Sequence, residues 1–177
     1  ATHKFQIFEI LIFESFKLNQ LESSKDYYSI VLQKCCGEDL RVYLTNNSSK
    51  INWTSKIRIA TDIANGLKYI HRANIVHHAL NPKHILEHDG KFVIIGFSLS
   101  VSLNEDSTPD PAEKISDSEN IYVDPVRSNI NYNNDKSSDI YSLGLVLWEM
   151  SSGKIPNMRN KEAPVSSTPI DYKELYE

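Results

Sequence analysis

The sequence predicts an α+β fold that is mainly helical, with a small strand-bearing part before a larger helical part. Apolar residues recur at three- and four-residue spacing over residues 53–70, which predicts a long amphipathic helix. Residues 140–150 are apolar on most sides, which predicts a second, more deeply buried helix. Residues 27–33 are rich in aromatic and β-branched side chains, and this composition favours a strand.

The N-terminal part is the less clearly patterned of the two. Residues 5–18 are apolar with mixed periodicity, so they are compatible with a helix or with a buried strand. Residues 19–26 are polar and are interpreted as a loop, and the strand at 27–33 then leads to Gly37, where it ends. We place the boundary between a small part, residues 1–33, and a large part, residues 34–177.

In the large part, a short helix is predicted at 38–44, followed by a polar loop that ends at Asn52, a favourable helix cap. The face of the long helix is predicted to comprise Trp53, Ile57, Ala60, Ile63, Ala64, Leu67 and Ile70. The later helix is predicted to be buried all round through Ile140, Leu143, Leu145, Val146, Leu147, Trp148 and Met150, and to end at Gly153 and Pro156.

Two connecting segments complete the pattern. Asp89-Gly90 is a strong tight-turn signal, and it predicts a β-hairpin whose turn includes Glu87 and His88. Residues 98–136 are polar and rich in Ser and Asn, which indicates a long loop.

Composition excludes several classes of function. The chain has 177 residues, 40% of them apolar, and a net charge of −4, which suits a globular protein and gives no basic stripe for nucleic acid. Its apolar runs are too short for a membrane span, so no membrane partner is expected. Cys35 and Cys36 are adjacent, a poor arrangement for a disulfide, and we therefore expect a reducing, cytoplasmic location.

Several motifs, in the same order along the chain, resemble the eukaryotic protein kinase family, in particular its tyrosine-kinase-like branch. Residues 75–86 read IVHHALNPKHIL where the family has a catalytic loop of the type HRDLKPxN, and Gly96-Phe97-Ser98 stands where it has DFG. Residues 122–125 read YVDP, and residues 138–149 read SDIYSLGLVLWE, similar to a helix of that branch. The resemblance implies a protein-kinase-like fold: a helical large lobe at 34–177, truncated at its C-terminus, after a partial small lobe.

The departures from the family pattern fall on the chemical groups. By resemblance, Ala79 stands for the aspartate that orients the substrate hydroxyl, and Asn81 for the lysine that contacts phosphate. His84 and Gly96 stand for the asparagine and aspartate that bind Mg²⁺. We therefore assign no catalytic residue and no metal ligand, and expect no cofactor. Glu87 and Asp89 are the nearest acids, and the hairpin turn should direct both away from the cleft.

The residues that match the family are architectural. His77, Phe97, Asp139 and Gly144 occupy positions that hold the loop and the central helix together, and Asp139 is expected to accept hydrogen bonds from backbone N–H groups of the loop. One structural position also departs, because Val126 replaces a glutamate whose ion pair anchors the segment in the family.

These observations predict a catalytically degenerate fragment resembling a pseudokinase, a protein-interaction or regulatory module in signalling. Its expected partner is another protein, with an active kinase as the first candidate. The alternative is an atypical protein kinase that binds ATP and has weak or relocated phosphoryl-transfer activity. Leu86, which matches a position under the adenine ring, is the one nucleotide-binding candidate; the sequence contains no glycine-rich loop, and this argues for weak ATP binding and against Mg²⁺.

Overall fold

The computed structural model describes residues 21–24, 27–30, 37–47, 50–104, 120–128, 135–157 and 168–169. The chain divides into two compact units, residues 1–36 and 37–177. Several predictions lie outside the described residues: the apolar segment at 5–18, the end of the strand with the two cysteines at 31–36, and most of the long loop, at 105–119 and 129–134.

The described part of the first unit is an antiparallel hairpin. It consists of β1 (Leu21–Ser24) and β2 (Tyr27–Ile30), with Leu21 opposite Ile30. The strand predicted at 27–33 is confirmed over its first four residues. The loop predicted at 19–26 is wrong over β1, because backbone pairing with β2 makes a strand of four residues that have little strand propensity of their own.

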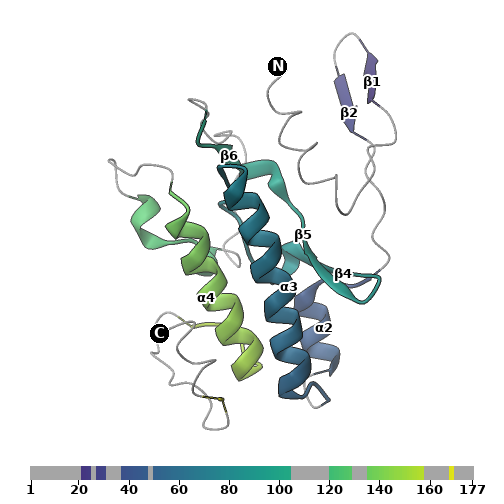
Figure 1. Ribbon diagram of the computed structural model, residues 1–177, viewed down its shortest axis with the longest axis vertical. Helices are drawn as coiled ribbons and strands as arrows, with labels where there is room; N and C mark the ends of the chain where they lie inside the picture. The colour runs from purple at the N-terminus through teal and green to yellow at the C-terminus, as the bar shows by residue number, and fades with distance from the viewer. Residues whose placement is uncertain are drawn as a thin grey trace. The chain divides into compact units, whose positions relative to one another are not determined.

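The described part of the larger unit contains three α-helices: α2 (Leu40–Asn47), α3 (Trp53–Arg72) and α4 (Ser137–Ser152). The helices α3 and α4 lie side by side, with the β4–β5 hairpin packed against α3 (Figure 1). The short predicted helix is confirmed as α2 with both ends shifted. The predicted cap at Asn52 is also confirmed, because its side chain accepts a hydrogen bond from the Ser55 N–H at 2.9 Å.

The buried face of α3 differs in part from the prediction. It comprises Ile59, Ala60, Ile63, Leu67 and Ile70. Ile57 is 49% exposed and Ala64 is exposed, so both were wrongly placed in the core. The prediction placed the apolar stripe at the wrong position around the helix. Ile59 begins the four-residue steps that reach Ile63 and Leu67, whereas Ile57 lies about 200° around the helix from Ile59.

The remaining strands form two short antiparallel pairs. β3 (Ile75–Val76) pairs with β6 (Val101–Ser102), and β4 (Ile85–His88) pairs with β5 (Lys91–Ile94). Asp89 and Gly90 both have positive φ, 50° and 76°, as a type I′ turn requires, so the predicted hairpin is confirmed. Among the described residues, four short 3₁₀ helices lie between these elements: η1 (Pro82–His84), η2 (Phe97–Leu99), η3 (Asn120–Tyr122) and η4 (Pro125–Ser128).

The helix α4 is less uniformly apolar in its packing than its sequence suggests. Ile140 is 54% exposed, whereas five polar residues are buried: Ser138, Asp139, Ser142, Glu149 and Ser151. The apolar count of the segment predicted burial on all sides, but the buried positions include polar groups that are bonded to other segments. The helix ends as predicted at Gly153, whose φ is 69° and whose N–H bonds to the Glu149 carbonyl.

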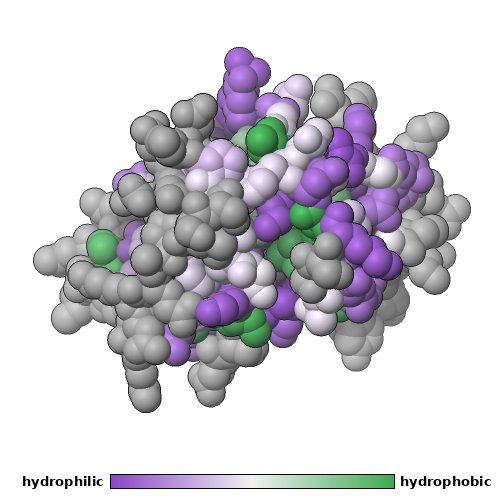
Figure 2. Space-filling view, turned by 90° about the horizontal axis from the view of Figure 1, so that it is seen from below, coloured by the Kyte–Doolittle hydropathy of each residue, from purple (hydrophilic) through white to green (hydrophobic). Residues whose placement is uncertain are grey.

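Large apolar side chains are exposed singly on the described surface. They are Val42, Ile57, Tyr69, Leu103, Val126, Ile140 and Ile155. The coloured face in Figure 2 is mostly hydrophilic, with small separate hydrophobic areas. None of the described helices is both long and apolar enough to cross a bilayer.

Candidate functional site

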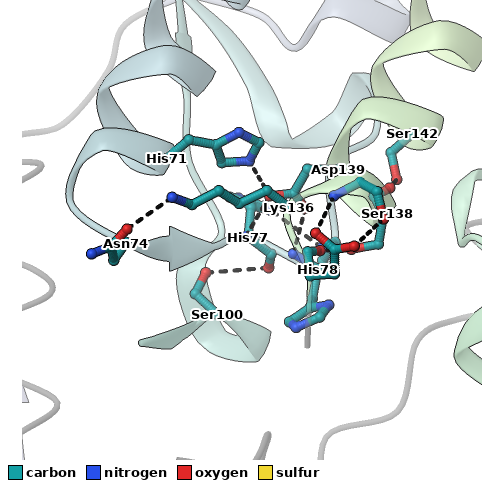
Figure 3. Close-up of polar contacts among 12 residues, drawn as sticks. His71, Asn74, His77, His78, Ser100, Lys136, Ser138, Asp139 and Ser142 are labelled. Atoms are coloured by element: carbon teal, nitrogen blue, oxygen red, sulfur yellow. Dashed lines mark hydrogen bonds and ion pairs between the residues drawn. The ribbon is translucent and has the colours of Figure 1, made fainter. Parts of the chain in front are cut away.

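The loop between β3 and β4 is buried along most of its length, and one carboxylate from α4 holds its backbone. Residues 75–82 are all buried. The Asp139 carboxylate accepts hydrogen bonds from the backbone N–H groups of His77 and His78, each at 2.8 Å, and from His71 Nε2 at 2.9 Å (Figure 3). Buried N–H groups require such acceptors, so the predicted structural task of Asp139 is confirmed.

The electrostatics of Asp139 follow from these contacts. Its side chain is fully buried, and burial alone would raise the pKa of the carboxyl. The hydrogen bonds from His71 and from the backbone of His77 and His78 outweigh burial and hold the pKa of Asp139 below its usual value. The loop is therefore fastened by an ionised carboxylate.

His77 connects the loop to the segment that contains Phe97. The two rings meet edge to face, with centroids 4.8 Å apart. His77 Nε2 donates to the Ile95 carbonyl at 2.8 Å, and Nδ1 accepts the Ala79 N–H at 3.2 Å. Burial lowers the pKa of His77 to about 4, so its ring is neutral at pH 7. The structure thus brings three of the four predicted frame residues together, while Gly144 lies in the middle of α4.

The residues at the four predicted chemical positions also contact one another. The Ala79 carbonyl lies 3.0 Å from Asn81 Nδ2 and 2.7 Å from His84 Nδ1, and Asn81 Oδ1 accepts the Lys83 N–H at 2.8 Å. A carbonyl oxygen can only accept, so the short contact with His84 requires the proton on Nδ1. In the neutral ring, Nε2 is therefore the unprotonated nitrogen.

The fourth position, Gly96, lies against the His84 ring. Gly96 has φ 80°, in the left-handed region, and a Cβ at this position would lie 2.7 Å from Cδ2 and 2.8 Å from Cγ of His84. Real Cβ atoms do not approach other atoms so closely. The imidazole thus occupies the space that a side chain at position 96 would require, a relationship that the sequence pattern did not reveal.

The groups in this cluster do not fit a magnesium ion. Mg²⁺ prefers hard oxygen ligands in octahedral geometry, whereas Ala79, Gly96 and the His84 imidazole offer no side-chain oxygen. The one side-chain oxygen of the cluster, Asn81 Oδ1, already accepts the Lys83 N–H. Glu87 Oε1 instead accepts the Gly90 N–H at 2.7 Å, and the Asp89 side chain is 92% exposed in the hairpin turn. Within the described ranges, no three His, Cys, Asp or Glu side chains are grouped as a metal site would require.

A buried polar cluster that the sequence reasoning missed joins α2, η3 and α4. Arg41 Nε lies 2.6 Å from Glu149 Oε1, Arg41 Nη2 donates to the Tyr122 hydroxyl at 2.6 Å, and this hydroxyl in turn donates to Glu149. Burial raises the pKa values of both Tyr122 and Glu149. The signal available in the sequence was Glu149 itself, an acid within an apolar helix, but its partners lie 108 and 27 residues away.

The segment that carries Tyr122 has two further links to the core. The Ser142 hydroxyl donates to the Tyr122 carbonyl at 2.7 Å, and Arg127 Nη1 donates to the His78 carbonyl at 2.7 Å. Val126, which replaces the glutamate of the family pattern, is 53% exposed. The described part of this segment is therefore fixed by Tyr122 and Arg127.

Leu86, the candidate for contact with a nucleobase, lies in β4 and is half-buried. Its backbone forms an isolated antiparallel bridge with Asp39, close to the start of the second unit. The role in nucleotide binding stays a prediction.

Comparison with known proteins gives one family. The family model of protein tyrosine and serine/threonine kinases matches residues 14–174. The RAF proto-oncogene serine/threonine-protein kinase of Xenopus laevis is 33% identical over 136 residues, which cover 75% of this chain and 21% of that protein. A probable serine/threonine-protein kinase of Clostridium acetobutylicum is 33% identical over 138 residues, 77% of this chain and 20% of that protein. The chain thus spans about a fifth of the length of these curated relatives.

Proposed function

Because this chain belongs to the protein tyrosine and serine/threonine kinase family, we propose that it is a catalytically inactive member. In this proposal it is a pseudokinase-type module that acts by binding and regulating another protein in signalling, in the cytoplasm. An active kinase is the first candidate for the partner.

One observation carries the proposal: the positions that resemble the two essential aspartates hold Ala79 and Gly96, and the His84 ring fills the space beside Gly96. Loss of a general base alone typically lowers a rate by about 10²–10⁴, which could leave a slow enzyme. Phosphoryl transfer also depends on cations that neutralise the phosphates, and the cluster has no carboxylate to hold them. We infer that the loss of both functions removes the reaction.

The retained contacts support a role in binding. The loop is held by Asp139, the Phe97 segment by His77, and the Tyr122 segment by Arg41 and Glu149. These interactions maintain a defined surface without taking part in chemistry. A rigid surface of this kind is what a binding module requires, since less ordering entropy is lost on association.

A phosphoryl-transfer assay with radiolabelled ATP tests the proposal. The reference is a triple variant with Ala79→Asp, His84→Asn and Gly96→Asp, because Gly96→Asp alone would collide with the ring. We expect no transfer above background from the unsubstituted chain. Transfer by the unsubstituted chain that EDTA abolishes would support the atypical-kinase alternative instead.

Thermal melting gives an independent test that does not need an active reference. A ligand that binds only the folded chain raises its Tm. We expect Mg²⁺ to add nothing to any effect of ATP, because the cluster offers no carboxylate ligand. A Tm rise that depends on Mg²⁺ would contradict the proposal.

The regulatory role is tested through the partner. The rate of an active family kinase is measured with and without an equimolar amount of this chain. We expect a change in rate that survives in the Gly90→Ala control, whose substitution lies in the exposed turn. An unchanged rate and no detectable association would contradict that kinase as the partner.

A further inference from the structure

We propose that the His84 ring occupies the position at which the family binds a cation. The ring excludes any side chain at position 96, and without a side chain there a divalent cation has no ligand at that position. This inference rests on the proposed absence of catalysis and deepens it. It states that the losses at positions 84 and 96 are one coupled change and not two independent ones.

The first support is the way in which the ring is held. His84 ends η1, and its Nδ1–H bonds to the Ala79 carbonyl at 2.7 Å. The Asn81 amide lies beside the same oxygen, at 3.0 Å. Moving the ring away from Gly96 therefore breaks a short hydrogen bond in a loop that is largely buried. The ring does not behave as the free end of a flexible side chain.

The second support is the fixed backbone on the other side of the contact. The Ile95 N–H bonds to the His84 carbonyl at 2.9 Å, so the residue before Gly96 is tied to the residue that carries the ring. Gly96 then precedes η2 as its N-cap residue, with φ 80° and ψ 50°. Neither side can retreat without loss of a backbone or side-chain hydrogen bond.

Gly90 provides a matched control for the strain that a side chain causes at a left-handed backbone position. Gly90 has φ 76°, close to the 80° of Gly96, but a Cβ at Gly90 would have nothing within 4 Å. The substitution Gly90→Ala therefore measures the strain of a left-handed alanine alone, whereas Gly96→Ala measures that strain together with the collision with His84. The difference between them isolates the effect of the ring.

The experiment is a set of melting curves of the 177-residue chain with Gly96→Ala or Gly90→Ala, each with and without His84→Ala. With His84 present, we expect the fall in Tm from Gly96→Ala to be at least twice that from Gly90→Ala. With His84→Ala, we expect the two falls to be equal. A Gly96→Ala effect that His84→Ala leaves unchanged overturns the inference. If Gly96→Ala does not fold, recovery of a cooperative melt with His84→Ala supports the inference, and failure in both backgrounds overturns it.

The cation is tested with MgCl₂ against EDTA, without nucleotide. We expect Mg²⁺ to raise the Tm of the double variant His84→Asn/Gly96→Asp and to leave the Tm of Gly96→Asp unchanged. An equal response of the two variants, or none from the double variant, overturns the inference. The proposed function fails on a different result, namely Mg²⁺-dependent ATP binding or transfer by the unsubstituted chain, so the two failures are distinguishable.

Discussion

The carboxylate of Asp139 accepts the backbone N–H of His77 at 2.8 Å across 62 residues of sequence. This bond and its neighbours at His78 and His71 fasten a buried loop to α4 through a single side chain. Loss of this carboxylate would leave three donors without their acceptor, so we expect the fold to be sensitive to substitution of Asp139.

We therefore expect Asp139→Asn to lower the free energy of unfolding by about 1–3 kcal/mol, because the new amide presents N–H groups to donors that need an acceptor. Urea denaturation measures the change. Asp89→Asn is the matched control, since Asp89 is exposed in a turn that also suits asparagine, and it should change stability by less than about 0.5 kcal/mol. Equal effects of the two substitutions would contradict the role assigned to Asp139.

The second prediction concerns pH. The pKa of His77 is lowered to about 4 in the fold from an ordinary 6.5, so the unfolded chain binds the proton more readily between these values. The contribution of His77 to stability is then fully present above about pH 6.5 and falls as pH decreases towards 4, by about 2 kcal/mol between pH 7 and pH 5. The lowered pKa of Asp139 acts only below about pH 4, outside this window.

Urea denaturation at pH 7 and pH 5 measures this effect. The substitution His77→Asn removes the titrating ring and should reduce the pH-dependent loss, even though the variant starts from a lower stability. His88→Gln, at the end of β4, should leave it unchanged. A loss that persists in His77→Asn would assign the pH dependence to another group.

The third prediction tests the cluster of Arg41, Tyr122 and Glu149. Tyr122→Phe removes a hydroxyl that is bonded to both charged partners, and we expect a loss of about 1.5–3 kcal/mol in the free energy of unfolding. The same change at Tyr69, which is 55% exposed, provides the control and should cost less than about 0.5 kcal/mol. A Tyr122→Phe variant as stable as the control would show that the hydroxyl contributes little.

The fourth prediction concerns Arg127, which bonds to the His78 carbonyl. Arg127→Ala should weaken the attachment of residues 120–128 by about 1 kcal/mol, seen as roughly fivefold faster amide hydrogen exchange there. Arg72→Ala, at an exposed position near the end of α3, should leave that exchange unchanged. Faster exchange in both variants would indicate a general loss of stability instead.

Periodicity predicted the elements more reliably than the partners of their side chains. The helix α3 and the β4–β5 hairpin depend on local spacing and on Asp89-Gly90, and both were predicted. The exposure of Ile57 and the burial of Ile59 were not predicted, because periodicity indicates that an apolar stripe exists but not exactly where it lies around the helix. Which stripe is buried depends on what packs against it.

At the candidate site, too, local motifs predicted which residues matter but not which distant residues they contact. Family motifs led to the loop, to Asp139 and to the altered positions 79, 81, 84 and 96. They did not predict that Arg41 would meet Glu149, or that His84 would cover Gly96, since these contacts join segments with no shared local pattern. Only the packed chain brings these residues into contact.

The contact between His84 and Gly96 has a consequence for the history of the chain. An acid at position 96 is blocked while the ring remains, and an asparagine at position 84 brings no carboxylate by itself. Under the proposed function, recovery of a cation site therefore requires both substitutions, because neither alone provides a carboxylate with space to bind. Under that proposal, the chemistry of the family returns by only one order of substitution, in which position 84 loses its ring before position 96 gains its acid.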